Sequence, residues 1–261
     1  MREICLKNTL YLCVFILSTF FIYPLQANAG SLGTINTDFA DDGIVLEDFD
    51  YEKVYLWGQS IAIDSDGRIV VATYGREDSD ADYDFIIARY DTDGELDESF
   101  SDNGYKSVNF SEEKDGDDSS DYVSSITILE DGTIAVAGHT YHKYENDDGY
   151  DMNSMDMAIL FLDEDGDEIS KHTVNFGFFD DAADTYDEAY DDYAFSVTHD
   201  TEGRVILGGY TKQLQDDYSQ KYLFALARFE FGSEWQLDED FGTDGIDTIE
   251  LSGITFHMGS V

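Results

Sequence analysis

A glycine-centred pattern recurs three times in this 261-residue sequence and constrains its fold more than any other feature. In each copy, an apolar run rich in Ile and Val is followed by a short acidic turn ending in glycine, and then by a second apolar run. The copies span residues 60–75, 125–140 and 195–211, with turns at Asp66-Gly67, Asp131-Gly132 and Glu202-Gly203. Short glycine-containing turns between β-branched runs predict three β-hairpins.

A second pattern follows each hairpin. A third apolar run lies at residues 84–94, 156–166 and 223–233, and a closing segment follows at 98–110 and 239–251, with a degraded copy around His172 to Phe176. Residues 38–49 match the closing segment alone. In this segment Phe39, Phe100 and Phe241 stand four residues before Gly43, Gly104 and Gly245. We expect the phenylalanine to be a packing anchor and the glycine a turn residue with positive φ.

The repeats together predict an all-β fold. The hairpin turns lie 65 and 71 residues apart, with four expected strands in each unit. This period is typical of propeller blades, so we expect a partial or open β-propeller of repeated four-stranded antiparallel sheets. Residues 30–261 would form one repeat domain: a half unit at 30–58, units at about 59–122, 123–193 and 194–251, and the truncated start of a further unit at 252–261. Such an array is either open, completed by another chain at an open sheet edge, or a fragment of a longer propeller.

Residues 1–29 have the three parts of an export signal. Arg2 and Lys7 make the start basic, residues 11–23 are mostly apolar, and Ala27-Asn28-Ala29 is a small-x-small cleavage site that places the mature start at Gly30. We therefore expect an exported protein, periplasmic or extracellular. Both cysteines, Cys5 and Cys13, lie in this segment, so the mature chain would have no disulfide, thiol nucleophile or cysteine-bound metal.

The chain is strongly acidic, with a formal net charge of −44. A charge of this sign argues against nucleic acid and anionic membranes as partners, because both select basic surfaces. It favours cations, or a cationic or saccharide partner.

At these repeats the sequence resembles the delta-60 repeat family. The matching stretches are residues 66–72, 84–90, 94–100, 224–229 and 237–245. The resemblance implies β-propeller arrays in exported bacterial proteins and supplies no catalytic residue. The middle unit departs from the family pattern, because Phe161 stands where the pattern has arginine and the Leu-Asp-x-Ser-Phe-Gly part is lost.

The connections predict where a binding surface would lie. Two sets are long, acidic and rich in tyrosine: 76–83, 141–155 and 212–222 between second and third strands, and 50–59, 111–122 and 177–193 between units. In an antiparallel sheet both sets emerge at the same end. Long loops on a rigid scaffold commonly carry binding sites.

Few residues indicate chemistry. The run from Asp91 to Asp97 has part of a calcium-loop spacing, repeated partly at 163–167, but Arg89 occupies one ligand position, which favours a plain hairpin turn over calcium. His139 and His142 are interpreted as residues at a loop edge. The sequence predicts structural ion pairs for Arg89 and Arg228. The remaining histidines are scattered, and Trp57 and Trp235 stand alone, which favours a packing role.

We therefore assign no catalytic, cofactor-binding or metal-binding residue from the sequence. The leading hypothesis is a non-catalytic binding or scaffold module that uses the long Asp/Tyr-rich connections. The alternatives are a carbohydrate-active enzyme with paired Asp and Glu residues, and a truncated fragment of a longer propeller protein without activity of its own.

Overall fold

The computed structural model describes residues 35–45, 57–76, 81–110, 120–145, 151–176, 191–214 and 220–250. The chain divides into two compact units, Met1–Thr37 and Asp38–Val261, and the second contains every strand described below. The predicted export signal at residues 1–29, residues 252–261 and most of the long connections lie outside the described ranges. Within those ranges no helix is long and apolar enough to cross a bilayer.

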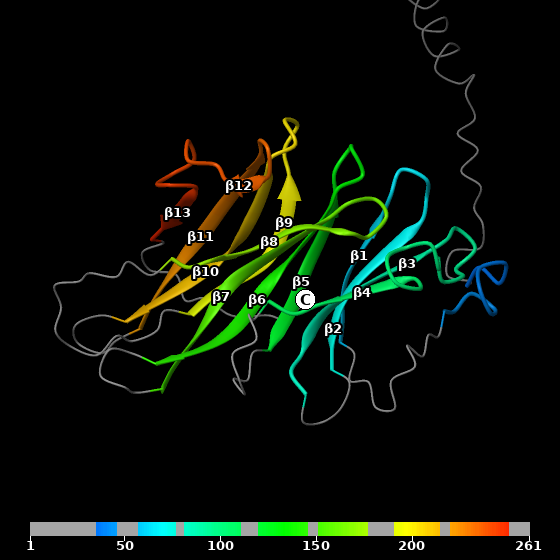
Figure 1. Cartoon of the computed structure of the whole chain (residues 1–261), viewed down its shortest axis with the longest axis horizontal. Helices are drawn as coiled ribbons and strands as arrows, with labels where there is room; N and C mark the ends of the chain where they lie inside the picture. The colour runs from blue at the N-terminus through cyan, green and yellow to red at the C-terminus, as the bar shows by residue number, and fades with distance from the viewer. Residues whose placement is uncertain are drawn as a thin grey trace, which may run out of the picture. The chain divides into compact units, whose positions relative to one another are not determined.

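The second unit contains three antiparallel sheets, which we call blades 1, 2 and 3 (Figure 1). Blade 1 consists of β1 (Trp57–Ile63), β2 (Ile69–Gly75), β3 (Asp84–Tyr90) and β4 (Tyr105–Val108) in that order. Blade 2 repeats the order with β5 (Asp121–Ile128), β6 (Ile134–Glu145), β7 (Asp151–Leu162) and β8 (Glu168–Val174).

Blade 3 begins in the same way and ends differently. Its first three strands are β9 (Asp191–His199), β10 (Val205–Leu214) and β11 (Gln220–Phe231). Two short strands, β12 (Trp235–Leu237) and β13 (Ile246–Ile249), then pair with successive parts of the same edge of β11. The fold is therefore all-β, built of repeated propeller-type sheets, as the sequence predicts.

The three predicted hairpins occupy equivalent positions. β1–β2, β5–β6 and β9–β10 are each closed by a turn whose glycine has positive φ: 84° at Gly67, 90° at Gly132 and 79° at Gly203. Each first strand also has a β-bulge at the same place, opposite the middle of the second strand. The three hairpins therefore share turn and bulge, which confirms that the repeat codes one structural unit.

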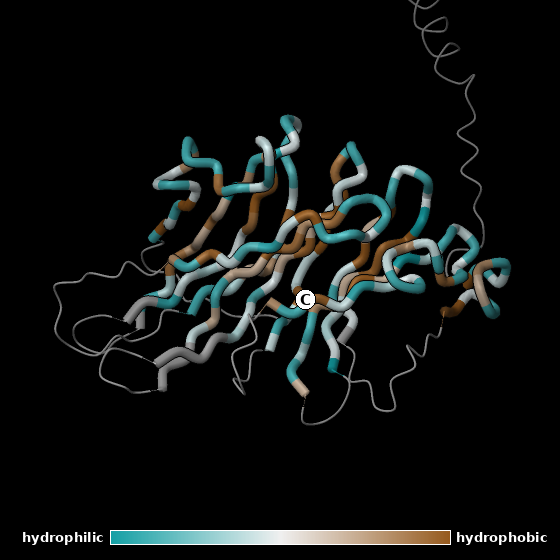
Figure 2. The backbone as a smooth tube through the Cα atoms, in the orientation of Figure 1, coloured by the Kyte–Doolittle hydropathy of each residue, from teal (hydrophilic) through white to brown (hydrophobic). Residues whose placement is uncertain are grey.

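The core lies between blades rather than within them. Alternate strand residues of blade 1, including Val70, Phe85 and Ile87, pack against Ile134 and Leu160 of blade 2 and are fully buried. The opposite face of blade 2 forms a second core with blade 3. Figure 2 shows the hydrophobic residues along the central strands and the hydrophilic ones at the turns. Each fully buried Val, Leu, Ile or Phe contributes about 1.5–3 kcal/mol.

Two of the predicted connections are shorter than expected. Residues 141–145 and 151–155, predicted as loop, belong to β6 and β7, which continue as a paired ribbon up to Glu145 and Asp151. β10 and β11 extend likewise to Leu214 and Gln220. The polar composition of these segments suggested loops, but a two-stranded ribbon satisfies its backbone hydrogen bonds without an apolar face. His139 and His142 consequently lie within a strand, and their interpretation as residues at a loop edge is wrong.

The glycine turns of the closing segments form as expected, but Phe39 and Phe241, two of the three predicted packing anchors, are only partly buried. Phe100 is fully buried, and Gly43, Gly104 and Gly245 have φ values of 87°, 98° and 92°. The degraded segment of blade 2 forms β8, whose seven residues make it longer than β4 or β13.

Candidate binding surface and the joints between blades

The strand ends joined by the long connections all lie at one end of the blades. Gly75 at the end of β2 pairs with Asp84 at the start of β3, and the Asp121 amide at the start of β5 donates to the Tyr83 carbonyl at 2.6 Å. The same relation holds in the other blades, because their strands run in the same order. We call this the loop-bearing end; the hairpin turns lie at the opposite, tight-turn end. The predicted common end of the two sets of connections is confirmed.

A chain of aromatic rings crosses all three blades at the loop-bearing end. Successive ring centroids lie 4.8–5.3 Å apart from Tyr74 in blade 1 through Tyr122 and His139 of blade 2 to Tyr193 and Tyr210 of blade 3. Side members join the chain: Tyr83, Phe195 and Tyr222. We call these eight residues the aromatic belt. Edge-to-face and offset pairs at these spacings stabilise one another beyond their burial.

The belt is part surface and part core. Phe195 is 49 % exposed and Tyr222 is 38 % exposed, whereas Tyr210 is buried beneath them. Burial, together with the nearby charge of Asp191, raises the pKa of Tyr193 to about 12. Burial also lowers the pKa of His139 to about 4, so the imidazole is neutral at physiological pH. The belt therefore presents uncharged aromatic faces to solvent.

A cation already lies on the belt. The guanidinium carbon of Arg76 stands 4.7 Å from the centroid of the Tyr83 ring. At the blade 3 end of the belt, Lys212 pairs at 2.9 Å with Asp191, which is next to the belt residue Tyr193. Arg76 is thus held by an aromatic face, and Lys212 is held by a carboxylate.

Two buried carboxylates join the blades beneath the belt. Asp121 and Asp192 occupy the same position at the start of β5 and β9, and both are fully buried. Each accepts a hydrogen bond of 2.7 Å from the backbone amide that follows the preceding blade, that of Phe110 and Phe176 respectively. Burial raises the pKa of Asp192 to about 7, although the hydrogen bond from the Phe176 amide acts in the opposite direction.

The asparagine before each of these phenylalanines makes a repeated contact. Asn109 donates to Asp84 and Asn175 donates to Asp156, both at 2.9 Å. The Val-Asn-Phe sequence at 108–110 and 174–176 therefore fixes the end of one blade and the start of the next. These carboxylates serve the joint between blades.

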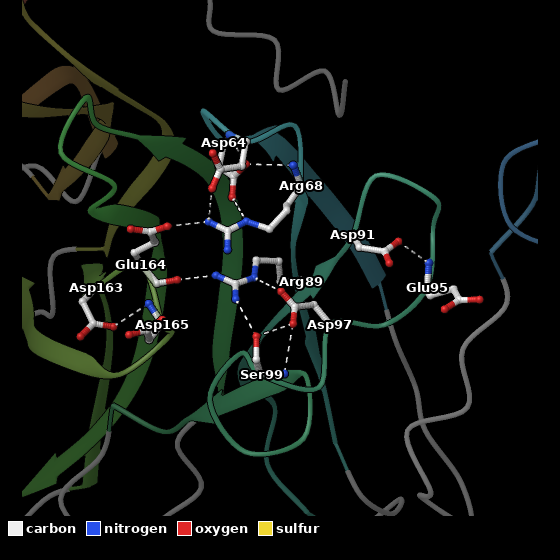
Figure 3. Close-up of polar contacts among 11 residues, drawn as sticks. Asp64, Arg68, Arg89, Asp91, Glu95, Asp97, Ser99, Asp163, Glu164 and Asp165 are labelled. Carbon is white, nitrogen blue, oxygen red and sulfur yellow. Dashed lines mark hydrogen bonds and ion pairs between the residues drawn. The ribbon is translucent and has the colours of Figure 1, made fainter.

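A different joint links blades 1 and 2 at the tight-turn end (Figure 3). Arg89 is 1 % exposed; its Nε donates to Asp97 at 2.8 Å and its guanidinium lies 4.8 Å from the Phe100 ring centroid. The other side of the guanidinium donates to the Glu164 carbonyl of blade 2. Burial opposes ionisation of Asp97, but hydrogen bonds from Ser99 and Arg89 hold its pKa below the usual value. The predicted ion pair of Arg89 is confirmed.

Arg68 adds a second link beside the first. It pairs with Asp64 at 2.6 Å within its own hairpin and with the Glu164 carboxylate at 2.7 Å across the joint. These groups border a cavity of about 170 Å³ that Glu130 and Asp131 also line. Arg68 thus pairs with one carboxylate in its own blade and one in the next, so this arrangement fastens the two blades.

The joint between blades 2 and 3 uses aromatic stacking in place of these ion pairs. Phe161 stands at the position of Arg89, and the indole of Trp235 from blade 3 lies parallel to it, with ring centroids 4.2 Å apart. Phe229 completes the cluster at 5.8 Å from Phe161. A cavity of about 290 Å³ borders it, lined by His172, Thr173, Phe229, Glu234, Trp235, Gln236 and Leu237.

The partial calcium spacings form ordinary turns. The Asp91 carboxylate accepts the amides of Asp93 and Glu95, and the Asp163 carboxylate accepts those of Asp165 and Asp167, each at 2.9–3.0 Å. Within the described ranges no three acidic, histidine or cysteine side chains are gathered in a way that could hold a metal ion. The turns are thus closed by their own backbone.

The other residues considered from the sequence have structural partners. Arg228 pairs with Asp238 at 2.6 Å, which confirms its predicted ion pair, and Trp235 is buried as predicted. The side chain of Trp57 is not among the side chains that the structure describes. The aromatic belt was not predicted, although tyrosine enrichment around the long connections was its signal.

Comparisons with known proteins agree with the fold. A family described as "Domain of unknown function (DUF5122) beta-propeller" matches residues 65–100, from the first hairpin turn to the buried Phe100. No curated protein matches the sequence. A solved structure of a fucose lectin from Kordia zhangzhouensis in complex with methyl-fucoside is 14 % identical and covers 67 % of this chain and 94 % of its own, with a TM-score of 0.29. A TM-score this low supports no functional inference. The sheets described above and the matching family together identify an all-β protein of propeller-type blades.

Proposed function

We propose that this protein is a non-catalytic binding module that holds cationic groups on the aromatic belt. The observation that carries the proposal is the unbroken row of uncharged rings across three blades, with the Arg76 guanidinium lying over Tyr83. That intramolecular contact is the kind a cationic partner would make with the exposed members of the belt.

Electrostatics favours the same class of ligand. A cation over an aromatic face gains about 0.5–1 kcal/mol at an exposed site and about 2 kcal/mol when desolvated. The net charge of −44 adds a long-range field that attracts cations and repels anions. Binding should weaken as salt screens this field, while the contribution of the ring faces remains.

The acids nearest the belt support a binding role over a catalytic one. Asp121 and Asp192 are fully buried and accept backbone amides from the preceding blade. A general acid or base must reach the substrate, and these carboxylates are committed to the joint.

A saccharide is the second candidate ligand, favoured by the cavity between blades 2 and 3. Its lining combines the edge of Trp235 with the hydrogen-bonding side chains of His172, Glu234 and Gln236. Its volume of about 290 Å³ is near the lower end of ligand sites, roughly 300–1,000 Å³.

Export is part of the proposal. The basic start, the apolar run and the Ala27-Asn28-Ala29 site support secretion to the periplasm or beyond. Mass spectrometry of the protein recovered from an expressing cell tests this: a mature chain starting at Gly30 is expected, and an intact chain retained in the cytoplasm would contradict it.

Isothermal titration with an oligoarginine peptide tests the ligand class. Phe195→Ala and Tyr222→Ala should each weaken binding several-fold, because each removes about 1 kcal/mol of cation–ring attraction from an exposed member of the belt. The matched control is Phe231→Ala, which removes a ring that is 60 % exposed at the tight-turn end and should leave the affinity unchanged.

Two outcomes would reject the proposal. If belt and control variants bind the peptide equally, charge alone attracts it and the belt is not the site. If a neutral oligosaccharide binds and the peptide does not, the cavity candidate replaces the belt, and Gln236→Ala should then abolish that binding.

A further inference from the structure

Blade 3 has a face that its equivalents in blades 1 and 2 keep buried. Val70, Ala72, Phe85 and Ile87 of blade 1 face blade 2 and are 0 % exposed. By strand register their counterparts in blade 3 are Ile206, Gly208, Phe224 and Leu226, all of which are partly exposed. Ile249 of β13 is 43 % exposed, whereas its counterparts Val108 and Val174 are 4 % and 3 % exposed. We call this the front face of blade 3.

The front face also carries half of a polar joint. Arg228 repeats the contacts that Arg89 makes within its own blade: it pairs with Asp238 at 2.6 Å and its guanidinium lies 4.6 Å from the Phe241 ring centroid. In blade 1 the other half is the Glu164 carbonyl of the following blade. Among the described residues no sheet follows β13, so this half joint faces outward.

The back face of blade 1 carries exposed apolar residues at the positions that contact a preceding blade in blades 2 and 3. Ile61 and Ile63 of β1 are 63 % and 68 % exposed. The residues equivalent to Ile61 in blades 2 and 3 are Ile126 and Val197. They are 7 % and 6 % exposed because they pack on the preceding blade. Trp57 also has the register position of the belt residues Tyr122 and Tyr193. One chain therefore exposes the front half of this contact and the β1 edge of the back half, whereas Ile86, Ala88 and Tyr90 of β3 on the same back face are already buried.

We propose that the front face of blade 3 docks on the back face of blade 1 of a second copy of this chain. Such a contact is heterologous, and it closes into a ring when the rotation between blades permits. Two copies with three blades each would give six, within the range of about four to eight seen in closed propellers. Association occurs through sheet faces, which distinguishes it from pairing at an open strand edge.

A short segment already occupies part of the docking position. Phe39 lies against Gly94, and the Ala40 amide donates to the Asp93 carbonyl at 2.7 Å. Phe100 and Ser101 make the same two contacts with Gly166 and Asp165 of blade 2. The segment 38–43 thus imitates a closing segment of a preceding blade.

Docking exchanges this segment for its counterpart from the copy. Residues 38–43 and 240–245 share the pattern Asp-Phe-x-x-Asp-Gly, so Phe241 of the copy can take the place of Phe39 on Gly94. The exchange replaces one set of contacts by a like set, as in domain swapping, so its own free-energy change is small. The additional burial of Ile61, Ile63, Leu226 and Ile249 then favours the assembled form.

The net charge of the chain makes the association of two copies depend on salt concentration. Each copy carries a net charge of −44, so two copies repel one another at low ionic strength. Salt shortens the Debye length to about 3 Å at 1 M and removes most of this repulsion, while burial of apolar surface is retained. Association should therefore strengthen with added salt.

Sedimentation velocity of the full chain at low and high ionic strength tests the proposal. The wild-type protein should form a dimer whose fraction rises with salt. Ile249→Asp on the front face and Ile61→Asp on the back face should each reduce ring formation at least tenfold. Ile169→Asp, at a residue of β8 that is 41 % exposed and belongs to neither face, should not. Leu226→Asp provides a second front-face variant, and circular dichroism shows that each variant is folded.

Mixing the front-face variant with the back-face variant distinguishes a front-to-back contact from a front-to-front contact. The Ile249→Asp variant retains an intact back face, and the Ile61→Asp variant retains an intact front face. An equimolar mixture of the two should therefore recover a dimer with one intact contact. Wild-type protein that stays monomeric at all salt concentrations overturns the proposal. A dimer sensitive to Ile249→Asp but not to Ile61→Asp overturns it as well, because that result indicates a front-to-front contact.

Discussion

The indole of Trp235 lies parallel to the ring of Phe161, at 3° between the planes and 4.2 Å between centroids. This pair joins blades 2 and 3 at the position where Arg89, Asp97 and the Glu164 carbonyl join blades 1 and 2. The same architectural contact is therefore made by an apolar stack in one joint and by a buried ion pair in the other. The blade that follows supplies a ring in the first case and a carbonyl oxygen in the second.

Removal of the indole should loosen the joint between blades 2 and 3. Trp235 is 3 % exposed, so Trp235→Ala should lower the free energy of unfolding by about 3–5 kcal/mol through lost burial and the cavity it leaves. Guanidinium unfolding followed by circular dichroism measures the change. Phe231→Ala, which removes a ring that is 60 % exposed, should cost much less, and equal losses would contradict a central role for the stack.

Removal of the buried guanidinium should weaken the joint between blades 1 and 2. Arg89→Leu leaves Asp97 and the Glu164 carbonyl without their donor, a change that costs about 3–5 kcal/mol when one partner of a buried pair is lost. Arg204 provides the comparison, because its side chain is 30 % exposed and pairs with Asp200 and Glu202 at the surface. Arg204→Leu should cost much less than Arg89→Leu in the same thermal or chemical denaturation, because exposed ion pairs contribute little to stability. Similar losses for the two arginines would show that Arg89 is not buried in solution.

Stability should depend on the ionisation of Asp192. Burial raises its pKa from 3.8 to about 7 in the folded state, so the folded protein binds this proton more tightly than the unfolded chain does. This carboxyl therefore contributes a stability that is fully present below pH 3.8 and is lost as pH rises to about 7. The slope is at most about 1.4 kcal/mol per pH unit.

Asp192→Asn isolates this contribution, because an amide can keep the hydrogen bond from Phe176 and does not ionise. The stability of the variant relative to the wild type should increase between pH 4 and pH 7, as urea unfolding across that range would measure. The comparison removes the opposite contribution of His139, whose pKa of about 4 makes stability rise with pH over much of the same window. A constant difference between variant and wild type would mean that Asp192 titrates alike in both states.

A side chain at Gly166 should be poorly tolerated. Its φ is 85° and a β-carbon there would stand 2.7 Å from the Phe100 ring. Gly166→Ala should cost about 1–2 kcal/mol for the left-handed conformation and about 1–3 kcal/mol for overpacking. At Gly232, the equivalent turn of blade 3, nothing lies within 4 Å of a β-carbon, and Gly232→Ala should be nearly neutral in a thermal melt. A reversed order of the two variants would contradict the contact between Phe100 and the turn.

The local structure of each repeat can be derived from its residues alone. Ile- and Val-rich runs with glycine turns predict the strands because side-chain alternation and turn conformation are set by neighbouring residues. The sequence also predicted the buried Phe100 and the ion pairs of Arg89 and Arg228, since the same closing segment recurs beside each. The prediction of loops at residues 141–145 and 151–155 was wrong, because polar residues in a paired two-stranded ribbon have the composition of loop residues.

Which residues cover each sheet face depends on how the blades pack against one another. Alternation tells which side chains share a face, but the partner of Phe161 stands 74 positions later in the chain, and that of the Phe110 amide is a carboxylate across a connection. The aromatic belt arises in the same way, because its rings come from three blades and meet only when the sheets are packed. Contacts between distant segments depend on the rotation from one blade to the next, and no local pattern encodes that rotation.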